Sequence, residues 1–184
     1  MRPTRNLMLV TLAALAITAC DNKAANDTAA TPEAKETAGD KTLAKGIPAD
    51  SKLAAALKAA GLDATLAGPG PYTVLAPDDA AFEKLPAGAL DTLMKPESRA
   101  DLTALLTYHI LPGTILASDI SKAIDAGQGK TVLATMGGGT LTATKEGDSV
   151  VLSDGAGGKA KVTQADDKRS NGVIHRIDGV LMPS

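Results

Sequence analysis

Two histidines and one cysteine are the residues of this 184-residue chain best suited to chemistry. His109 follows Tyr108 at the end of an apolar helical pattern, while His175 shares a strand face with Val173 and Ile177. A histidine in either setting is usually packed and hydrogen-bonded. The chain has no Gly-x-Ser-x-Gly elbow for a nucleophilic serine and no pair of histidines at metal-binding spacing. We therefore expect no enzymatic activity, no metal and no cofactor.

Two glycine-rich stretches also lack the partners that their possible chemistry needs. The stretch Asp154–Gly158 is loosely similar to a calcium loop, but it lacks the alternating acidic ligands. Residues 137–139 are three glycines that open no helix, so they form no phosphate-binding cradle. Asp154 and Gly155 are expected to supply a turn.

The N-terminus has the features of a secretory signal. Arg2 and Arg5 precede an apolar run from Leu7 to Ile17, which is shorter than the roughly 20 residues that a membrane-spanning helix needs. Cys20 follows this run and is the only cysteine, so it cannot form an intrachain disulfide. The alternative for a lone cysteine is a small buried thiol.

The four residues that end at Cys20, Ile-Thr-Ala-Cys, resemble a bacterial lipobox. The resemblance implies a signal peptide over residues 1–19 and attachment of lipid to Cys20, which would anchor the chain to a bacterial membrane. Residues 20–41 then form a polar tether, expected to be disordered because it has almost nothing apolar to bury. Asp21 resembles a signal for retention at the inner membrane in enteric bacteria; otherwise it is simply the first residue of the tether.

The composition argues against nucleic acid as a partner. The chain has 21 acidic residues against 19 basic ones, with no basic cluster to neutralise phosphates. It has three aromatic residues, so stacking on exposed rings is not expected.

The elements that position these residues divide into helices first and strands last, which predicts an α+β domain. We expect a helix that Asp50 or Ser51 caps and Gly61 ends, a short turn at Leu62 and Leu66, and a helix that Asp78 caps and in which Phe82 faces the core. We also expect helices from Pro86 to Met94 and from Ser98 to His109. We expect strands or extended segments over Tyr72–Ala76, Ile110–Leu116, Thr131–Thr135, Thr140–Thr144, Ser149–Ser153, Ala160–Thr163 and Val173–Leu181.

Three blocks in this order and spacing resemble the fasciclin domain. They are Tyr72–Phe82, Leu102–Gly113 and Asn171–Pro183, within a region that runs from residue 42 to 184. The resemblance implies a compact β wedge or sandwich with several helices packed along it. It also implies an adhesion or interaction module rather than a catalyst.

The same resemblance marks Tyr108, His109 and Asp166 as candidate partner-binding residues. In animal matrix members the Tyr-His pair has been tied to integrin adhesion, although anchoring of both side chains near the core is the leading interpretation here. Animal members also carry an Asp-Ile pair, but Asp167 stands where the isoleucine would be. We therefore do not expect this chain to recognise integrins. Residues 167–169 are expected to form a solvated loop, or a rim contact for another partner.

Together these observations predict a lipid-anchored module of the cell envelope that mediates adhesion or binds an envelope or extracellular protein or polysaccharide. The chain would face either the periplasm or the cell surface. The alternative is a periplasmic accessory that binds a small ligand or supports envelope proteins. A purely structural role that spaces or decorates the envelope is a third possibility.

Overall fold

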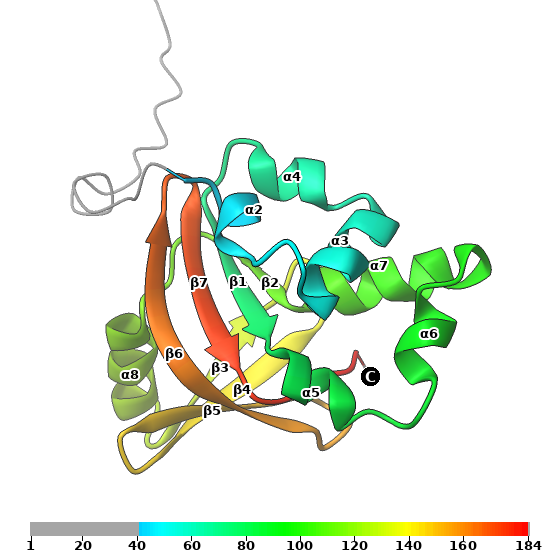
Figure 1. Ribbon diagram of the computed structural model, residues 1–184. Helices are drawn as coiled ribbons and strands as arrows, with labels where there is room; N and C mark the ends of the chain where they lie inside the picture. The colour runs from blue at the N-terminus through cyan, green and yellow to red at the C-terminus, as the bar shows by residue number, and fades with distance from the viewer. Residues whose placement is uncertain (1–40, 184) are drawn as a thin grey trace, which may run out of the picture.

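The computed structural model describes residues 41–183, in which seven strands form a single curled sheet in the order β2-β1-β7-β6-β5-β4-β3 (Figure 1). Strands β1 and β7 are parallel, and every other neighbouring pair is antiparallel. The strands are β1 (Tyr72–Pro77), β2 (Ile110–Pro112), β3 (Lys130–Ala134), β4 (Thr140–Glu146), β5 (Ser149–Ser153), β6 (Lys159–Arg169) and β7 (Gly172–Ile177).

The helices flank this sheet, so the predicted α+β class is confirmed. The helices are α2 (Leu43–Gly46), α3 (Lys52–Ala60), α4 (Asp63–Ala67), α5 (Asp79–Glu83), α6 (Ala89–Leu93), α7 (Arg99–Tyr108) and α8 (Ala117–Ala126), with a 3-10 turn at Pro96–Ser98. Helix α8 packs against β3, β4 and β5, whereas α2 lies against β7 and α5 against β1 (Figure 1).

Alternate side chains of the two central strands face two separate apolar clusters. Val74 and Ile174 pack with the residues of the helices on one side of the sheet. Leu75 and Ile177 pack inside the curl with residues from the other strands and α8. Successive strand residues point to opposite faces, and each face packs against one of the two clusters, so both faces of β1 and β7 are buried. His175, on β7, therefore lies inside the domain.

The two edges of the sheet meet at one end. The backbone N–H of Met136 donates to the carbonyl of Ile110 over 2.8 Å, and that of Gly137 donates to Thr107 over 3.1 Å. These bonds join the segment after β3 to the start of β2 and the end of α7. They close the sheet into a wedge that is nearly a barrel.

Local sequence signals explain the ends of two helices, α3 and α5. The Ser51 hydroxyl accepts from the N–H of Ala54, and Gly61 ends α3 in the left-handed conformation with φ 78°. The Asp78 carboxylate caps α5 by accepting from the N–H of Ala81 over 2.7 Å. These predicted caps are confirmed, as is the burial of Phe82, which is 5% exposed.

Two predictions about elements were wrong, and one helix was not predicted. Pro86 does not open a helix, since α6 begins at Ala89 after Gly88 in the left-handed conformation. Helix α8 was not predicted. It buries only Ile120 and Ile124, and its other residues are small or polar, so its apolar pattern is too weak to recognise in the sequence. Strand β6 continues to Arg169. The predicted solvated loop at residues 167–169 is therefore part of the sheet.

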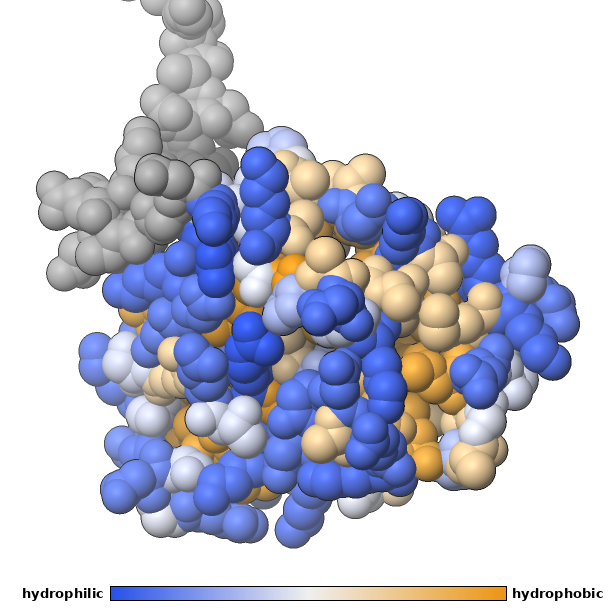
Figure 2. Space-filling view, viewed as in Figure 1, coloured by the Kyte–Doolittle hydropathy of each residue, from blue (hydrophilic) through white to orange (hydrophobic). Residues whose placement is uncertain are grey.

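The helix α6 is attached less tightly than its neighbours. None of its residues is buried, and its Leu90 and Leu93 pack half-exposed against the first apolar cluster. Figure 2 shows hydrophobic surface gathered beside this helix. Between residues 41 and 183, no helix has the length and apolar character needed to cross a bilayer.

Candidate functional site

His109 caps the end of α7 and uses both ring nitrogens inside the domain. The N–H of Leu181 donates to its Nε2 over 3.1 Å, which requires a lone pair on Nε2. The proton therefore sits on Nδ1, which donates to the carbonyl of Leu105 over 2.8 Å. Burial at 3% exposure lowers the pKa of His109 to about 4, against an ordinary value of 6.5. The ring ties the C-terminal segment to α7.

Tyr108 lies in the second apolar cluster at the closing seam of the sheet. Its hydroxyl donates to the carbonyl of Thr140 over 2.8 Å, and the residue is 2% exposed. Gly139 lies against the ring, where an added Cβ would stand 2.4 Å from the Tyr108 Cε2 atom. Burial raises the pKa of Tyr108, as does the charge of Asp154. The buried position favours the structural interpretation of Tyr108 and His109, and their contact with a partner stays a prediction.

Asp166 lies at an irregularity of β6, where the pairing with β7 shifts register. It is one of the few non-glycine residues with positive φ, at 60°. Its Oδ1 accepts from the N–H of Ala117 over 2.8 Å, at the first residue of α8. Its own N–H donates to Nδ1 of His175 over 3.1 Å, and Nε2 of His175 donates to the carbonyl of Ile115 over 2.8 Å.

The structure therefore brings Asp166 together with His175 and places both where β6, β7 and the entry to α8 meet. Tyr108 and His109 belong instead to the corner between α7 and β2. The three predicted partner-binding residues do not form one site. The Asp166 side chain is 35% exposed, so it alone of the three can be touched from outside, and that role stays a prediction.

Asp167 and Arg169 form an ion pair on β6 rather than a solvated run. Their side chains are only 21% and 19% exposed. Arg169 reaches over α2, where a Cβ added at Gly46 would lie 2.7 Å from its Nε. The pair therefore packs β6 against the first helix, which the sequence pattern alone did not indicate.

The carboxylate of Asp154, in the loop after β5, accepts three backbone N–H groups. Its Oδ1 accepts from the N–H groups of Ala156 and Gly158, over 3.0 and 2.6 Å. Its Oδ2 accepts from the N–H of Met182 over 2.8 Å. The carboxylate thus holds the turn and the C-terminal segment together. In the described residues, no group of three His, Cys, Asp or Glu side chains is placed to hold a metal ion.

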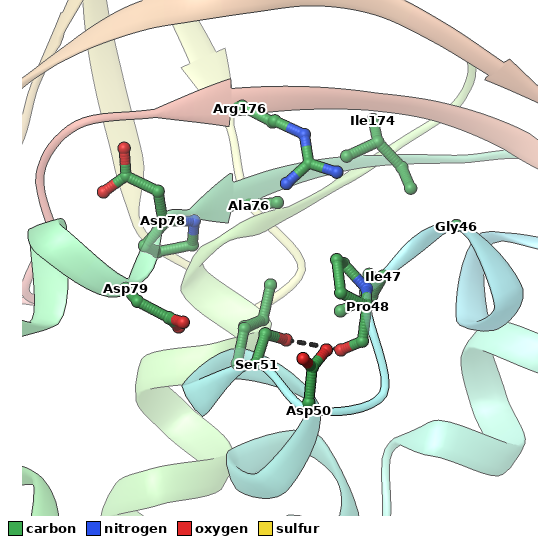
Figure 3. A pocket seen from close by; sticks show the side chains of 12 residues that line it. Gly46, Ile47, Pro48, Asp50, Ser51, Ala76, Asp78, Asp79, Ile174 and Arg176 are labelled. Atoms are coloured by element: carbon green, nitrogen blue, oxygen red, sulfur yellow. Dashed lines mark hydrogen bonds between the residues drawn. The ribbon is translucent and has the colours of Figure 1, made fainter.

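A cavity of about 300 Å³ lies between the α2–α3 connection and the ends of β1 and β7, beside the start of α5 (Figure 3). Arg176 of β7 contributes a guanidinium group to it, and Asp50 and Asp79 contribute carboxylates. No sequence pattern was recognised as indicating this cavity. One feature of the sequence could have indicated it. The alternation along β7 places Arg176 on the same face as Ile174, so a charged side chain stands on an otherwise apolar face.

Comparison with known proteins agrees with this architecture. Residues 49–183 match the family model of the fasciclin domain. Protein sll1483 of Synechocystis is 39% identical over 141 residues, covering 77% of this chain and 71% of that protein. Transforming growth factor-beta-induced protein ig-h3 of Sus scrofa is 40% identical over 132 residues, covering 71% of this chain but 17% of that protein.

Immunogenic protein MPB70 of Mycobacterium bovis is 34% identical over 114 residues, covering 62% of this chain and 51% of that protein. Among solved structures, a FAS1 domain pair from the insect cell adhesion molecule fasciclin I matches with a TM-score of 0.66 and 19% identity. It covers 76% of this chain and 50% of that one. The chain belongs to the fasciclin domain family, and its fold is the FAS1 fold.

Proposed function

We propose that this chain is a lipid-anchored fasciclin module of a bacterial cell envelope, which acts by binding another macromolecule and not by catalysis. The observation that carries the proposal is the fasciclin domain over residues 49–183, whose fold matches a domain pair of an insect cell adhesion molecule. The bonding of His109 and His175 supports it. Each ring uses both nitrogens to join backbone segments.

The anchor is proposed from the lipobox-like residues that end at Cys20, which lie outside the described part of the chain together with the predicted signal peptide and tether. The described domain begins beside the turn between β6 and β7, where the N–H of Ser170 donates to the carbonyl of Lys41 over 3.2 Å. A flexible tether of about 20 residues would have a typical reach of about 25 Å. In this proposal the predicted tether joins the domain beside its β6–β7 turn.

The test is membrane fractionation combined with protease treatment of intact cells, with a Cys20→Ala variant as control. We expect the wild-type chain in the membrane fraction and the variant released from it. If protease added outside removes the domain, the domain faces outward and adhesion is supported. A wild-type chain found entirely in the soluble fraction would contradict the anchor.

The periplasmic alternative is favoured by one specific observation, the cavity beside Arg176. Its volume of about 300 Å³ is at the lower end of the range for small-molecule sites. Protection of the domain until the outer membrane is opened would contradict cell–cell adhesion and support this alternative.

A further inference from the structure

Arg176 carries a guanidinium group that no other residue between 41 and 183 neutralises. Within residues 41–183 its side chain forms no ion pair and no hydrogen bond, although its carbonyl accepts from the Thr163 hydroxyl over 3.2 Å. The side chain is half-buried and points into the cavity (Figure 3). A guanidinium presents a planar fork of N–H donors that matches a carboxylate, so the cavity offers a site for one.

Carboxylates line the same cavity, which restricts the ligands that fit. Asp79 faces inward, but its Oδ1 already accepts from the N–H of Lys52 over 2.9 Å. Asp78 is likewise occupied in capping α5. Asp50 is exposed and has no hydrogen-bond partner among the described residues. A ligand with only negative charge would be repelled by these groups, whereas one that also carries an ammonium group would be attracted to them.

The charges occupy different sides of the cavity. In Figure 3 the guanidinium of Arg176 hangs from β7, while Asp50 and Asp79 lie across the space, at the starts of α3 and α5. A zwitterionic ligand lying between them can therefore contact both sides at once. The Ser51 hydroxyl is not available to it as a donor, because it donates to the carbonyl of Pro48 over 2.7 Å.

The remaining walls are apolar, with Ile47, Leu53 and Ile174 among the lining residues. All three belong to the first apolar cluster and are almost fully buried. They contribute aliphatic atoms to the lining of the cavity. A hydrocarbon side chain placed there would leave water, which favours binding.

We propose that this cavity binds a free aliphatic α-amino acid. Its carboxylate would pair with Arg176, its ammonium group with Asp50 and Asp79, and its side chain would contact Ile47 and Ile174. The proposal gives the small-ligand alternative a chemical class and rests on that alternative. It is independent of binding to a macromolecular partner.

Titration calorimetry on the purified full-length chain tests the proposal with L-leucine as the probe. Two further probes share its carbon skeleton, the acid that lacks the amino group and the amine that lacks the carboxyl group. We expect leucine to bind, and each of the two other probes to bind at least about tenfold more weakly, since each loses one charge-assisted contact. No heat from leucine, or equal affinity for the acid, would overturn the proposal.

Variants locate the binding. Arg176→Gln keeps a polar side chain of similar length but loses the charge, and should weaken leucine binding at least about tenfold. Arg99→Gln, which removes an arginine of α7 outside the cavity, should leave it unchanged. Asp50→Asn should weaken binding by a smaller factor, about two- to fivefold, because Asp50 is exposed to solvent.

Equal leucine affinity in Arg176→Gln and wild type would overturn the assignment to this cavity. Circular dichroism shows whether Arg176→Gln folds. If it does not, the proposal is tested by leucine binding to Asp50→Asn and by the affinities of the three probes for wild type. Binding to envelope fractions is measured on the same preparation. Saturable envelope binding without leucine binding would contradict only the proposed amino-acid site. Leucine binding without envelope binding would contradict only the proposed macromolecular partner.

Discussion

Both histidines use their two ring nitrogens to hydrogen-bond backbone groups of the domain. His109 links Leu105 to Leu181, and His175 links Asp166 to Ile115. In each ring one nitrogen accepts from a backbone N–H, so each needs the neutral form to keep both bonds. A residue type that suggests catalysis from the sequence therefore serves to hold loops and strands together.

The stability of the domain should depend on the protonation of His109. Its pKa is lowered from 6.5 to about 4 in the folded state, so the unfolded chain binds more protons between these values. The contribution of neutral His109 is complete above pH 6.5 and is lost as pH falls toward 4. The predicted loss is about 3 kcal/mol of unfolding free energy.

Urea unfolding at pH 7 and at pH 4 measures this loss, with His109→Gln as the reference that cannot titrate. Wild type should lose more stability than the variant over this interval, and the difference isolates His109 from the carboxylates. Equal losses in the two proteins would contradict the assignment.

The sequence was most informative at residues whose role depends on neighbours in the chain. Asp78 was identified as a helix cap, and Ser51 as one of two candidates beside Asp50, because the partners of Ser51 and Asp78 lie three residues away. Asp166 was noted from the family resemblance alone. Its structural partners are 49 and 9 residues distant, so no local pattern could indicate them.

At the scale of elements, side chains from distant segments complete helix ends that local residues leave open. Helix α8 follows Leu116, which has no side-chain oxygen to cap it, and Asp166 supplies the acceptor from β6. Asn171 acts similarly in the turn before β7. It accepts from the N–H of Leu43 and donates to the carbonyls of Leu66 and Gly68, which joins α2 and α4 to the sheet.

Removing the Asp166 carboxylate should loosen α8 before the rest of the domain. Asp166→Ala loses the acceptor for the N–H of Ala117, and it places alanine at a φ of 60°. We expect a loss of about 1 to 2 kcal/mol in unfolding free energy and faster amide exchange in the first turn of α8.

Hydrogen exchange with mass spectrometry measures the local effect. Asp166→Asn is the conservative variant, since asparagine tolerates positive φ and keeps an acceptor, and it should behave nearly as wild type. Glu146→Ala on the exposed end of β4 is the surface control. Unchanged exchange of α8 in Asp166→Ala would contradict the capping role.

Strand prediction succeeded where side chains alternate and failed where the backbone is irregular. The segments at β3, β4 and β5 were predicted within a few residues of their bounds. The extension of β6 to Arg169 was missed because polar residues there pair with β7 through two register shifts. The half-buried pair of Asp167 and Arg169 replaces the apolar signal by which a strand is normally recognised.

At the scale of the whole molecule, the domain is a closed wedge with its N-terminal entry beside the β6–β7 turn. The α+β class, the family and the order of the main elements could be predicted from the sequence. The cavity beside Arg176 could not, because it forms where the α2–α3 connection, β1, β7 and α5 converge. Cavities of this kind depend on the packing of segments far apart in the chain.

We propose that this domain works by binding a macromolecular partner, and a saturable binding curve is the decisive evidence for it. Labelled full-length chain is titrated onto intact cells and onto isolated envelope fractions, with unlabelled chain as competitor. We predict a binding curve that saturates and is displaced by the competitor. Binding that rises linearly with concentration and is not displaced, on both cells and envelope fractions, would contradict the account.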